Sequence, residues 1–292
     1  MYDYHYNKRL RPIGSTSALA FGIAIDTALN AMLTGSGDYI GEFHNAFQFD
    51  NLKDVVFDQK DLQIDLFTEE QLKQLPNDFN YQAWACLRIK GRVMLDAYKE
   101  QIFPMIEEVH GVQKKLDSRA GVLDAILTIT GYGMVLVDHK TSGMPYTIDA
   151  LEADTQLALY AADQKIDKVA YIVLCKTIRF NKTCRKCGDD GSTTQHKTCA
   201  SDKSGVRCYG EFDRSADKSK VIQLIIGDCS EVNKNIITSS IAVVETCIDK
   251  GLFASNINSC GNMFGKRCPY YNKCWFGKDD GLVITQETKE II

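Results

Sequence analysis

Two aspartates and a lysine occupy the ends of two short apolar segments that a Gly-Tyr-Gly turn connects. Asp124 opens the first segment, and Asp138 and Lys140 close the second. The pattern predicts a β-hairpin of two largely buried strands. Because paired strands lie about 5 Å apart, Asp124 and Asp138 would share one divalent ion. Alternation along the strand places Lys140 on the same face as Asp138 and sends His139 to the other face. These groups suit metal-dependent hydrolysis of phosphodiesters.

A helix is predicted directly after the hairpin. Asp149, followed three residues later by Glu152, resembles a capping box, and the helix that it opens is expected to run to about Gln164. Gln156 and Tyr160 are four residues apart, so they would share one face of this helix.

Four cysteines lie in a polar segment, residues 181–215, that has too few apolar residues to pack by itself. They are Cys184, Cys187, Cys199 and Cys208. This paired spacing is typical of a zinc ribbon, in which the metal replaces the missing core. His196 is an alternative ligand to Cys199. The competing interpretation is four unconnected cysteines.

A second cysteine group lies near the C-terminus and consists of Cys260, Cys268 and Cys274. Three thiolates are one short of a closed four-ligand site. The segment therefore indicates either a zinc or iron-sulphur site with a further ligand, or three structural thiols in a loop-rich tail.

The remaining pattern predicts a helical N-terminal part and a mixed sheet, hence an α/β fold. Phe21, Ile25, Leu29 and Met32 recur at helical spacing, with Ser15 or Ser17 as the cap. The expected helices cover 15–34, 69–74, 78–102, 149–164 and 231–250. The expected strands cover 109–116, 125–129, 134–137, 169–174 and 221–226.

Composition is that of an ordinary globular protein, with 292 residues, 45% hydrophobic and 25% charged. The formal charge of -4 does not by itself indicate nucleic acid, so contact with a polyanion would depend on local basic clusters. No segment has the roughly 18 uninterrupted apolar residues that span a bilayer. We therefore expect a soluble, intracellular protein with no membrane partner. In such a protein the 11 cysteines are expected to be metal ligands rather than disulfides.

Three ordered motifs resemble the RecB-like branch of the PD-(D/E)XK nuclease superfamily. They are Gly121-x-x-Asp124, Asp138-x-Lys140 and Gln156-x-x-x-Tyr160, followed by a tail with Cys-Pro-Tyr-Tyr. The resemblance covers most of the chain, from Leu10 to Cys274, and is closest to iron-sulphur members such as phage exonucleases and CRISPR adaptation nucleases. It implies a restriction-endonuclease-like mixed central sheet flanked by helices.

The resemblance also implies roles for single residues. Asp124, Asp138 and the backbone carbonyl of His139 would bind Mg²⁺ or Mn²⁺, and Lys140 would be the catalytic lysine. Gln156 and Tyr160 would belong to the helix that supports the site. The tail cysteines Cys260, Cys268 and Cys274 would hold a 4Fe-4S cluster.

The chain departs from the family pattern at two places. Relatives commonly carry a metal-binding histidine on the first helix, where this chain has Asp26. Asp26 is therefore either a further metal ligand or an acid on the helix surface. The first cluster cysteine of the relatives is also missing, and the fourth ligand would come from elsewhere or be absent; the candidates are His5, Cys86, Cys229 and Cys247.

The motifs and the resemblance predict a metal-dependent DNA nuclease in the cytoplasm of a bacterial or phage-infected cell. We expect an exonuclease that acts on DNA ends or single strands in replication, recombination or repair. Its expected partner is a helicase, a recombinase or a replication protein. The alternative is a weak or inactive nuclease-like scaffold that binds DNA or protein. The nuclease domain would comprise 1–180 and 216–292, interrupted by the zinc-ribbon-like insertion at 181–215. It would divide into a helical part at 1–104, a catalytic core at 105–180 and a C-terminal helix with the cysteine tail.

Overall fold

The computed structural model describes residues 10–12, 14–116, 121–191, 198–199, 208–252, 268, 270–280 and 282–284. Its centre is a five-stranded sheet with the order β10-β7-β6-β5-β4. These strands are β4 (Ile106–Lys115), β5 (Val122–Ile129), β6 (Gly133–Ser142), β7 (Lys168–Cys175) and β10 (Ile222–Asp228). Strands β6 and β7 run parallel, and all other neighbours in this sheet run antiparallel. The predicted α/β class with a mixed sheet is confirmed.

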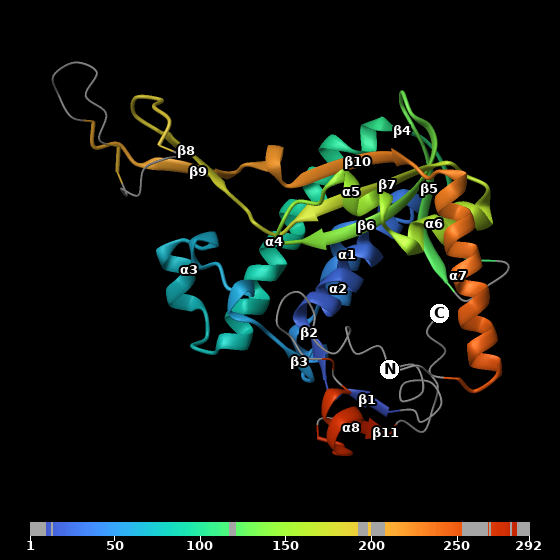
Figure 1. Cartoon of the computed structure of the whole chain (residues 1–292). Helices are drawn as coiled ribbons and strands as arrows, with labels where there is room; N and C mark the ends of the chain where they lie inside the picture. Colours follow the sequence, from blue (N-terminus) through green and yellow to red (C-terminus); the bar gives the residue numbers. More distant parts are fainter. Residues whose placement is uncertain are drawn as a thin grey trace.

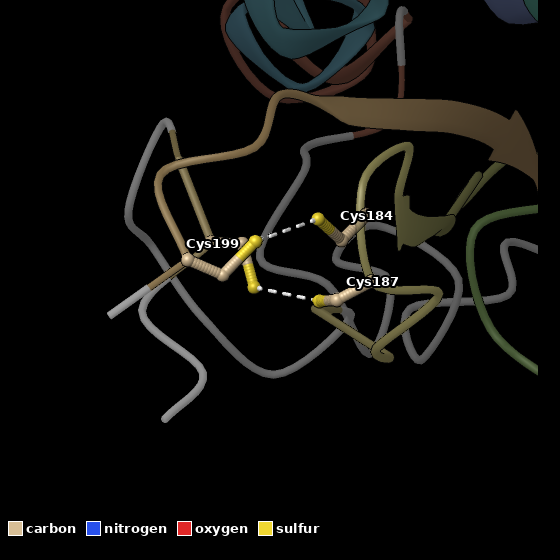
Figure 2. Close-up of side chains that lie close together, drawn as sticks. Cys184, Cys187 and Cys199 are labelled. Carbon is tan, nitrogen blue, oxygen red and sulfur yellow. Dashed lines mark hydrogen bonds between the residues drawn. The ribbon is translucent and has the colours of Figure 1, made fainter. Parts of the chain in front are cut away.

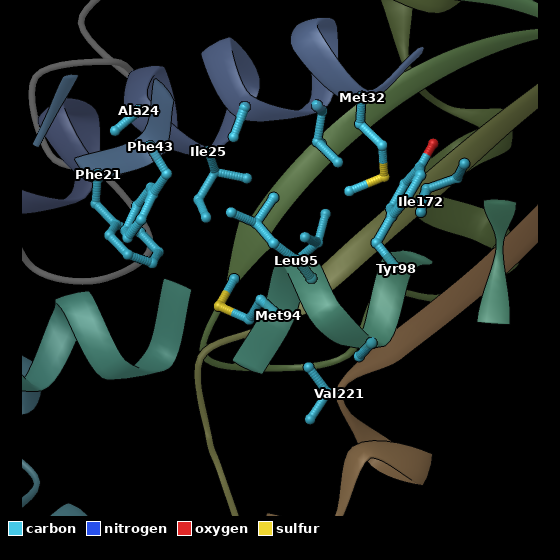
Figure 3. Close-up of a cluster of buried hydrophobic side chains, with 14 of the residues drawn as sticks. Phe21, Ala24, Ile25, Met32, Phe43, Met94, Leu95, Tyr98, Ile172 and Val221 are labelled. Atoms are coloured by element: carbon cyan, nitrogen blue, oxygen red, sulfur yellow. The ribbon is translucent and has the colours of Figure 1, made fainter. Parts of the chain in front are cut away.

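Helices pack on both faces of the sheet (Figure 1). Helices α1 (Ser17–Thr34) and α4 (Phe79–Gln101) cover one face, and α5 (Ile148–Glu152) and α6 (Thr155–Gln164) cover the other. Figure 3 shows the larger core, where Tyr98 of α4 and Ile25 of α1 lie with Ile172 of β7. The sheet is therefore buried on both sides, as the long apolar runs of β5, β6 and β7 require.

The first helix follows its predicted bounds closely but has a different cap. The side chain of Thr16 accepts from the Leu19 amide, and Gly35 ends the helix in the left-handed conformation. The predicted caps, Ser15 and Ser17, are wrong, because Ser17 lies inside the helix and its hydroxyl donates to Asp61. Helix α1 is long and apolar enough to cross a membrane by length and composition alone, and half of it is buried in this fold.

The predicted hairpin is present and pairs Ala125 with Val137 and Ile129 with Gly133. Gly131 and Gly133 both have positive φ, which explains the glycines in this turn. The hairpin presents two different faces. Leu127 and Val135 join the core under α1 and α4, whereas Leu136 joins the core under α6.

The single helix predicted over 149–164 is wrong, since the structure has two. Helix α5 is capped by Thr147, and α6 is capped by Asp154, whose side chain accepts from the Leu157 amide. The hydroxyl of Tyr171 also donates to Asp154, so β7 holds this second cap in place. The capping box expected from Asp149 and Glu152 is therefore not the start of the helix.

The polar insertion forms an antiparallel hairpin of β8 (Phe180–Cys184) and β9 (Phe212–Ala216) that projects away from the main sheet (Figure 1). Helix α7 (Glu231–Asp249) follows β10 and packs on α6. Near the ends of the chain, β1 (Leu10–Pro12) pairs with β11 (Leu282–Ile284) beside α8 (Tyr271–Phe276). The remaining α-helices and strands are α2 (Tyr39–Ala46), α3 (Glu69–Gln74) and the two-residue strands β2 (Ser15–Thr16) and β3 (Val55–Val56), and short 3₁₀ helices connect several elements.

Candidate metal centres

The pairing of β5 with β6 ends where Asp124 is reached. The last paired residues at this end are Ala125 and Val137. Beyond them, the Asp124 carboxylate accepts a hydrogen bond from the backbone amide of His139 (Oδ2 to N, 2.7 Å). The opposite neighbour, Gln113 of β4, has an unusual positive φ of 48°. The strands therefore separate at Asp124, which places its carboxylate between β5 and β6.

Helix α1 brings Asp26 to the same end of the sheet. The Gln113 amide donates to Asp26 Oδ2 at 2.8 Å, and Asn30 also bonds to the Asp26 carboxylate. The other oxygen, Oδ1, is buried and has no hydrogen-bond partner among the described residues. Since buried polar atoms are nearly always paired, this oxygen marks a place where a cation or water belongs.

His139 completes a group of three possible ligands. One ligand atom each from Asp26, Asp124 and His139 lies within 4.8 Å of the others. The predicted alternation of β6 is confirmed: the His139 ring packs on Tyr98 in the α1 and α4 layer, whereas Lys140 lies over the Tyr171 ring on the other face. The sequence did not reveal that the His139 face is the one that meets Asp26.

Asp138 and Lys140 form an ion pair on the α6 face, with Nζ 2.6 Å from Oδ2. Their predicted position on one face of β6 is confirmed. Asp138 is 7% exposed, so the pair is largely withdrawn from water. The Lys140 ammonium also lies 5.5 Å from the centre of the Tyr171 ring. Asp138 and Tyr171 therefore fix the position of the lysine.

Burial and repulsion from neighbouring acids raise the pKa of two of these carboxyl groups toward neutral pH. Burial, with the charge of Asp124, raises the pKa of Asp26 to about 7. Burial also raises the pKa of Asp138 to about 6, although Lys140 opposes the shift. Burial lowers the pKa of His139 to about 4, so its ring is neutral at pH 7, the form that binds metals. A bound cation would relieve the repulsion between the acids.

Asp26 makes stability depend on pH in the metal-free protein. Because its folded pKa is raised to about 7 from 3.8, the stability associated with the protonated group is present below pH 4 and is lost as pH rises through 7. We expect Asp26→Asn to raise the free energy of unfolding at pH 8 by on the order of 2 kcal/mol and to change it little at pH 4. Denaturant unfolding in the presence of a chelator measures this. An equal change at both pH values, or an equal effect of the exposed control Asp50→Asn, would contradict it.

Helix α6 packs on the face of the sheet that carries Asp138 and Lys140. The Gln156 amide donates to the Tyr160 hydroxyl at 2.8 Å, in agreement with their predicted common face. Tyr160 also packs on Gly121, where an added Cβ would lie 3.1 Å from the ring. This close contact gives a physical reason for glycine three residues before Asp124.

The four cysteines of the insertion form a second candidate centre. Their sulphur atoms all lie within 4.8 Å of one another, and Figure 2 shows Cys184, Cys187 and Cys199 turned toward a common point. The Sγ atoms are 3.7 Å apart for Cys184 and Cys208 and 3.6 Å apart for Cys187 and Cys199. These cysteines can hold a metal ion. The predicted alternative ligand, His196, lies outside the described residues.

The backbone around the cluster favours thiolate at Cys184. Burial opposes ionisation, but amides of Cys187 and Lys186 and the neighbouring thiols lower the pKa of the Cys184 thiol to about 7. Gly210 lies against the sulphur atoms, and an added Cβ would be 2.6 Å from Cys184 Sγ. Only glycine permits this approach.

A methyl group at position 210 tests the cluster. We expect Gly210→Ala to weaken metal retention about 10-fold or more, because the new Cβ must displace a ligand sulphur. Competition with a chromogenic chelator measures retention. Gly143→Ala is the matched control, since an added Cβ there meets nothing within 4 Å. Equal retention in both variants would show that Gly210 does not shape the cluster.

The tail cysteines are only partly described. Cys268 is half-buried beside Tyr270 and Leu282, and Cys274 is exposed on α8. Cys260 and His5 lie outside the described residues. The other candidate fourth ligands lie elsewhere in the fold: Cys86 is buried and bonded to Gln63, Cys229 is in the core under α6, and Cys247 is on α7.

Comparisons of the chain with protein-family models, with curated proteins and with solved structures found no match. Sequence reasoning missed Gln113, Tyr98, Asp154 and the His139 ring, which contact the predicted residues. The alternation of β6 placed His139 on the face opposite to Asp138 and Lys140, but only the position of α1 shows what the ring contacts.

Proposed function

We propose that the chain is a metal-dependent DNA nuclease with a restriction-endonuclease-like core. The observation that carries this proposal is the meeting of Asp26 and Asp124 at the end of β5 and β6, next to the Asp138–Lys140 pair. Three antiparallel strands followed by helices and a parallel strand support the fold part of the proposal. No other grouping of carboxylates with a lysine in the described residues has this combination of buried acids with raised pKa.

The donor set fits a divalent cation. Asp26 has one oxygen tied to Gln113 and a second, buried oxygen that lacks a partner among the described residues. Asp124 is anchored in the same way by the His139 amide. Ligands that are fixed through one atom and free at another are typical of built metal sites. When bound, Mg²⁺ or Mn²⁺ would polarise the scissile phosphate and make a coordinated water a stronger nucleophile.

The chain's own residues have distinct tasks in this proposal. Asp26 and Asp124 would hold the cation, and Asp138, whose charge interacts with Asp124, would be a further ligand. Lys140 orients the attacking water or offsets negative charge that develops on the phosphate. Asp138 keeps Lys140 charged, because it raises the lysine pKa against the opposing effect of burial. The ring of Tyr171, over which the Lys140 ammonium lies, also positions the lysine.

We propose that the substrate is DNA, at ends or in single strands, and that the role lies in replication, recombination or repair in a phage or its bacterial host. Incubation of purified protein with end-labelled single-stranded and double-stranded DNA, with and without Mn²⁺, tests the assignment. We expect release of short products only with the metal. Retention of intact DNA in a stable complex would instead favour a binding scaffold.

We propose Zn²⁺ as the ion of the insertion. A tetrahedral site with Zn–S bonds of about 2.3 Å has sulphur atoms about 3.8 Å apart, close to the 3.6 and 3.7 Å found here. Such short separations suit one ion bound by all four thiolates. A cluster of several irons, each bound by a different cysteine, would hold the thiolates further apart.

For the tail we propose an iron-sulphur or zinc site that includes Cys260, Cys268 and Cys274. Metal analysis of anaerobically purified protein distinguishes the two. Iron together with acid-labile sulphide would indicate a cluster in the tail, whereas two zinc ions per chain without iron would assign zinc to both sites.

A further inference from the structure

We infer that the His139 imidazole is a direct ligand of the proposed catalytic cation, through Nδ1, and that it makes the centre prefer a first-row transition ion such as Mn²⁺ over Mg²⁺. The inference rests on the proposed metal site and deepens it. The family resemblance implied the backbone carbonyl of His139 as a metal ligand; here the ligand is instead the imidazole of the same residue.

The geometry places the ring at the two aspartates. His139, Asp26 and Asp124 each offer a ligand atom within 4.8 Å of the others, from three separate elements: β6, α1 and β5. The backbone amide of His139 is already used by Asp124. This hydrogen bond holds the His139 backbone against the Asp124 carboxylate.

One ring nitrogen is fixed and the other is free. Nε2 lies 3.1 Å from the Tyr98 hydroxyl, while Nδ1 is buried without a hydrogen-bond partner among the described residues. Metal binding at Nδ1 requires the proton on Nε2, and the Tyr98 oxygen lies where it can accept a hydrogen bond from Nε2–H. Metal-bound histidines almost always donate their second ring N–H to an oxygen acceptor. Tyr98 is therefore a positioning residue.

The surroundings of Tyr98 make this orientation firm. The side chain of Tyr98, on α4, is 0% exposed and packs against α1 and the sheet (Figure 3). Its ring meets the His139 ring edge-on, with centroids 5.6 Å apart. The imidazole therefore has little freedom to turn away from Asp26 and Asp124.

An imidazole ligand changes which ions bind well. Mg²⁺ prefers oxygen ligands and keeps much of its water, whereas imidazole nitrogen binds transition ions well. A set of carboxylates with one imidazole should therefore bind Mn²⁺ more tightly than Mg²⁺. Removal of the imidazole should reduce that preference without removing the acids.

Pulsed electron paramagnetic resonance of the Mn²⁺-loaded full chain tests the inference. We expect modulation from a directly bound ¹⁴N nucleus in the wild type, replaced by a ¹⁵N signal when histidine is isotopically labelled. This measurement needs no variant. Mn²⁺ bound in a manner that depends on Asp124, but without nitrogen coupling, would overturn the inference and leave the proposed nuclease intact. Nitrogen coupling in a protein that cuts no DNA would support His139 as a ligand and contradict the proposed nuclease activity.

Variants identify the nitrogen. His139→Gln should abolish the coupling and weaken Mn²⁺ binding about 10-fold or more, with a smaller effect on Mg²⁺. Tyr98→Phe should keep the coupling but weaken Mn²⁺ binding, because the orienting bond is lost. The control is His110→Gln, since His110 contacts Thr128 on β5 and Glu108 on β4 and is not one of the three grouped ligands. Coupling that persists in His139→Gln, or that disappears in His110→Gln, would refute the assignment.

Discussion

Asp124→Asn is expected to lose both Mn²⁺ binding and metal-dependent DNA cleavage, while Lys140→Met is expected to lose cleavage and keep Mn²⁺ binding. Asp124 is a proposed ligand whose second oxygen anchors the His139 amide. Asparagine keeps an oxygen for that amide but removes the charge. Lys140 contacts Asp138 and is assigned to the reacting phosphate or water, so its loss should reduce the cleavage rate by about 10²- to 10³-fold or more.

Two measurements make this expectation specific. Cleavage of labelled DNA gives the rate, and titration with Mn²⁺ gives the metal affinity of each variant. Asp50→Asn, an exposed acid near α2, serves as the control that should retain both properties. Wild-type cleavage in Asp124→Asn and Lys140→Met would refute the nuclease assignment. Circular dichroism checks that each variant is folded. If Lys140→Met is unfolded, cleavage and Mn²⁺ binding are measured on Lys140→Gln instead.

Replacement of Cys184 and Cys187 by serine is expected to release the bound metal and unfold the β8–β9 hairpin. The hairpin has five paired positions and projects from the sheet, and an isolated hairpin is at best marginally stable in water. Apparent binding free energies of structural zinc are about 10–16 kcal/mol, far more than such a hairpin supplies by itself. Metal content should therefore fall by one ion per chain.

Limited proteolysis shows where the damage lies. We expect rapid cleavage near β8 and β9 in the serine variant, with the five-stranded sheet still resistant. The matched control is Cys175→Ser, because Cys175 is half-buried at the end of β7 and takes no part in the cluster. Unchanged metal content and unchanged cleavage in the double variant would contradict the account of the insertion.

Local patterns predicted the hairpin and the cysteine group well. The glycines of the Gly-Tyr-Gly turn have positive φ, and the short apolar runs on either side favour buried strands, so β5 and β6 were predictable from nearby residues. Thiolate spacing is equally local, and the structure brings the four sulphur atoms together. Short-range geometry was sufficient in both cases.

Features that depend on contacts between distant segments were not predictable. The break between α5 and α6 depends on Asp154, which is held by Tyr171 from β7. The capping box at Asp149 offered a start that was locally equivalent, so sequence alone favoured the wrong one. Similarly, alternation assigned His139 to a face, but only packing of α1 across that face brings Asp26 to it.

The position of bound manganese tests the central claim most directly. Crystals grown with Mn²⁺ and a short DNA whose phosphodiesters resist cleavage should give an anomalous peak between Asp26 and Asp124. A DNA phosphate should complete the site, within reach of the Lys140 ammonium. DNA bound elsewhere on the chain, with no manganese between these two aspartates, would contradict the account.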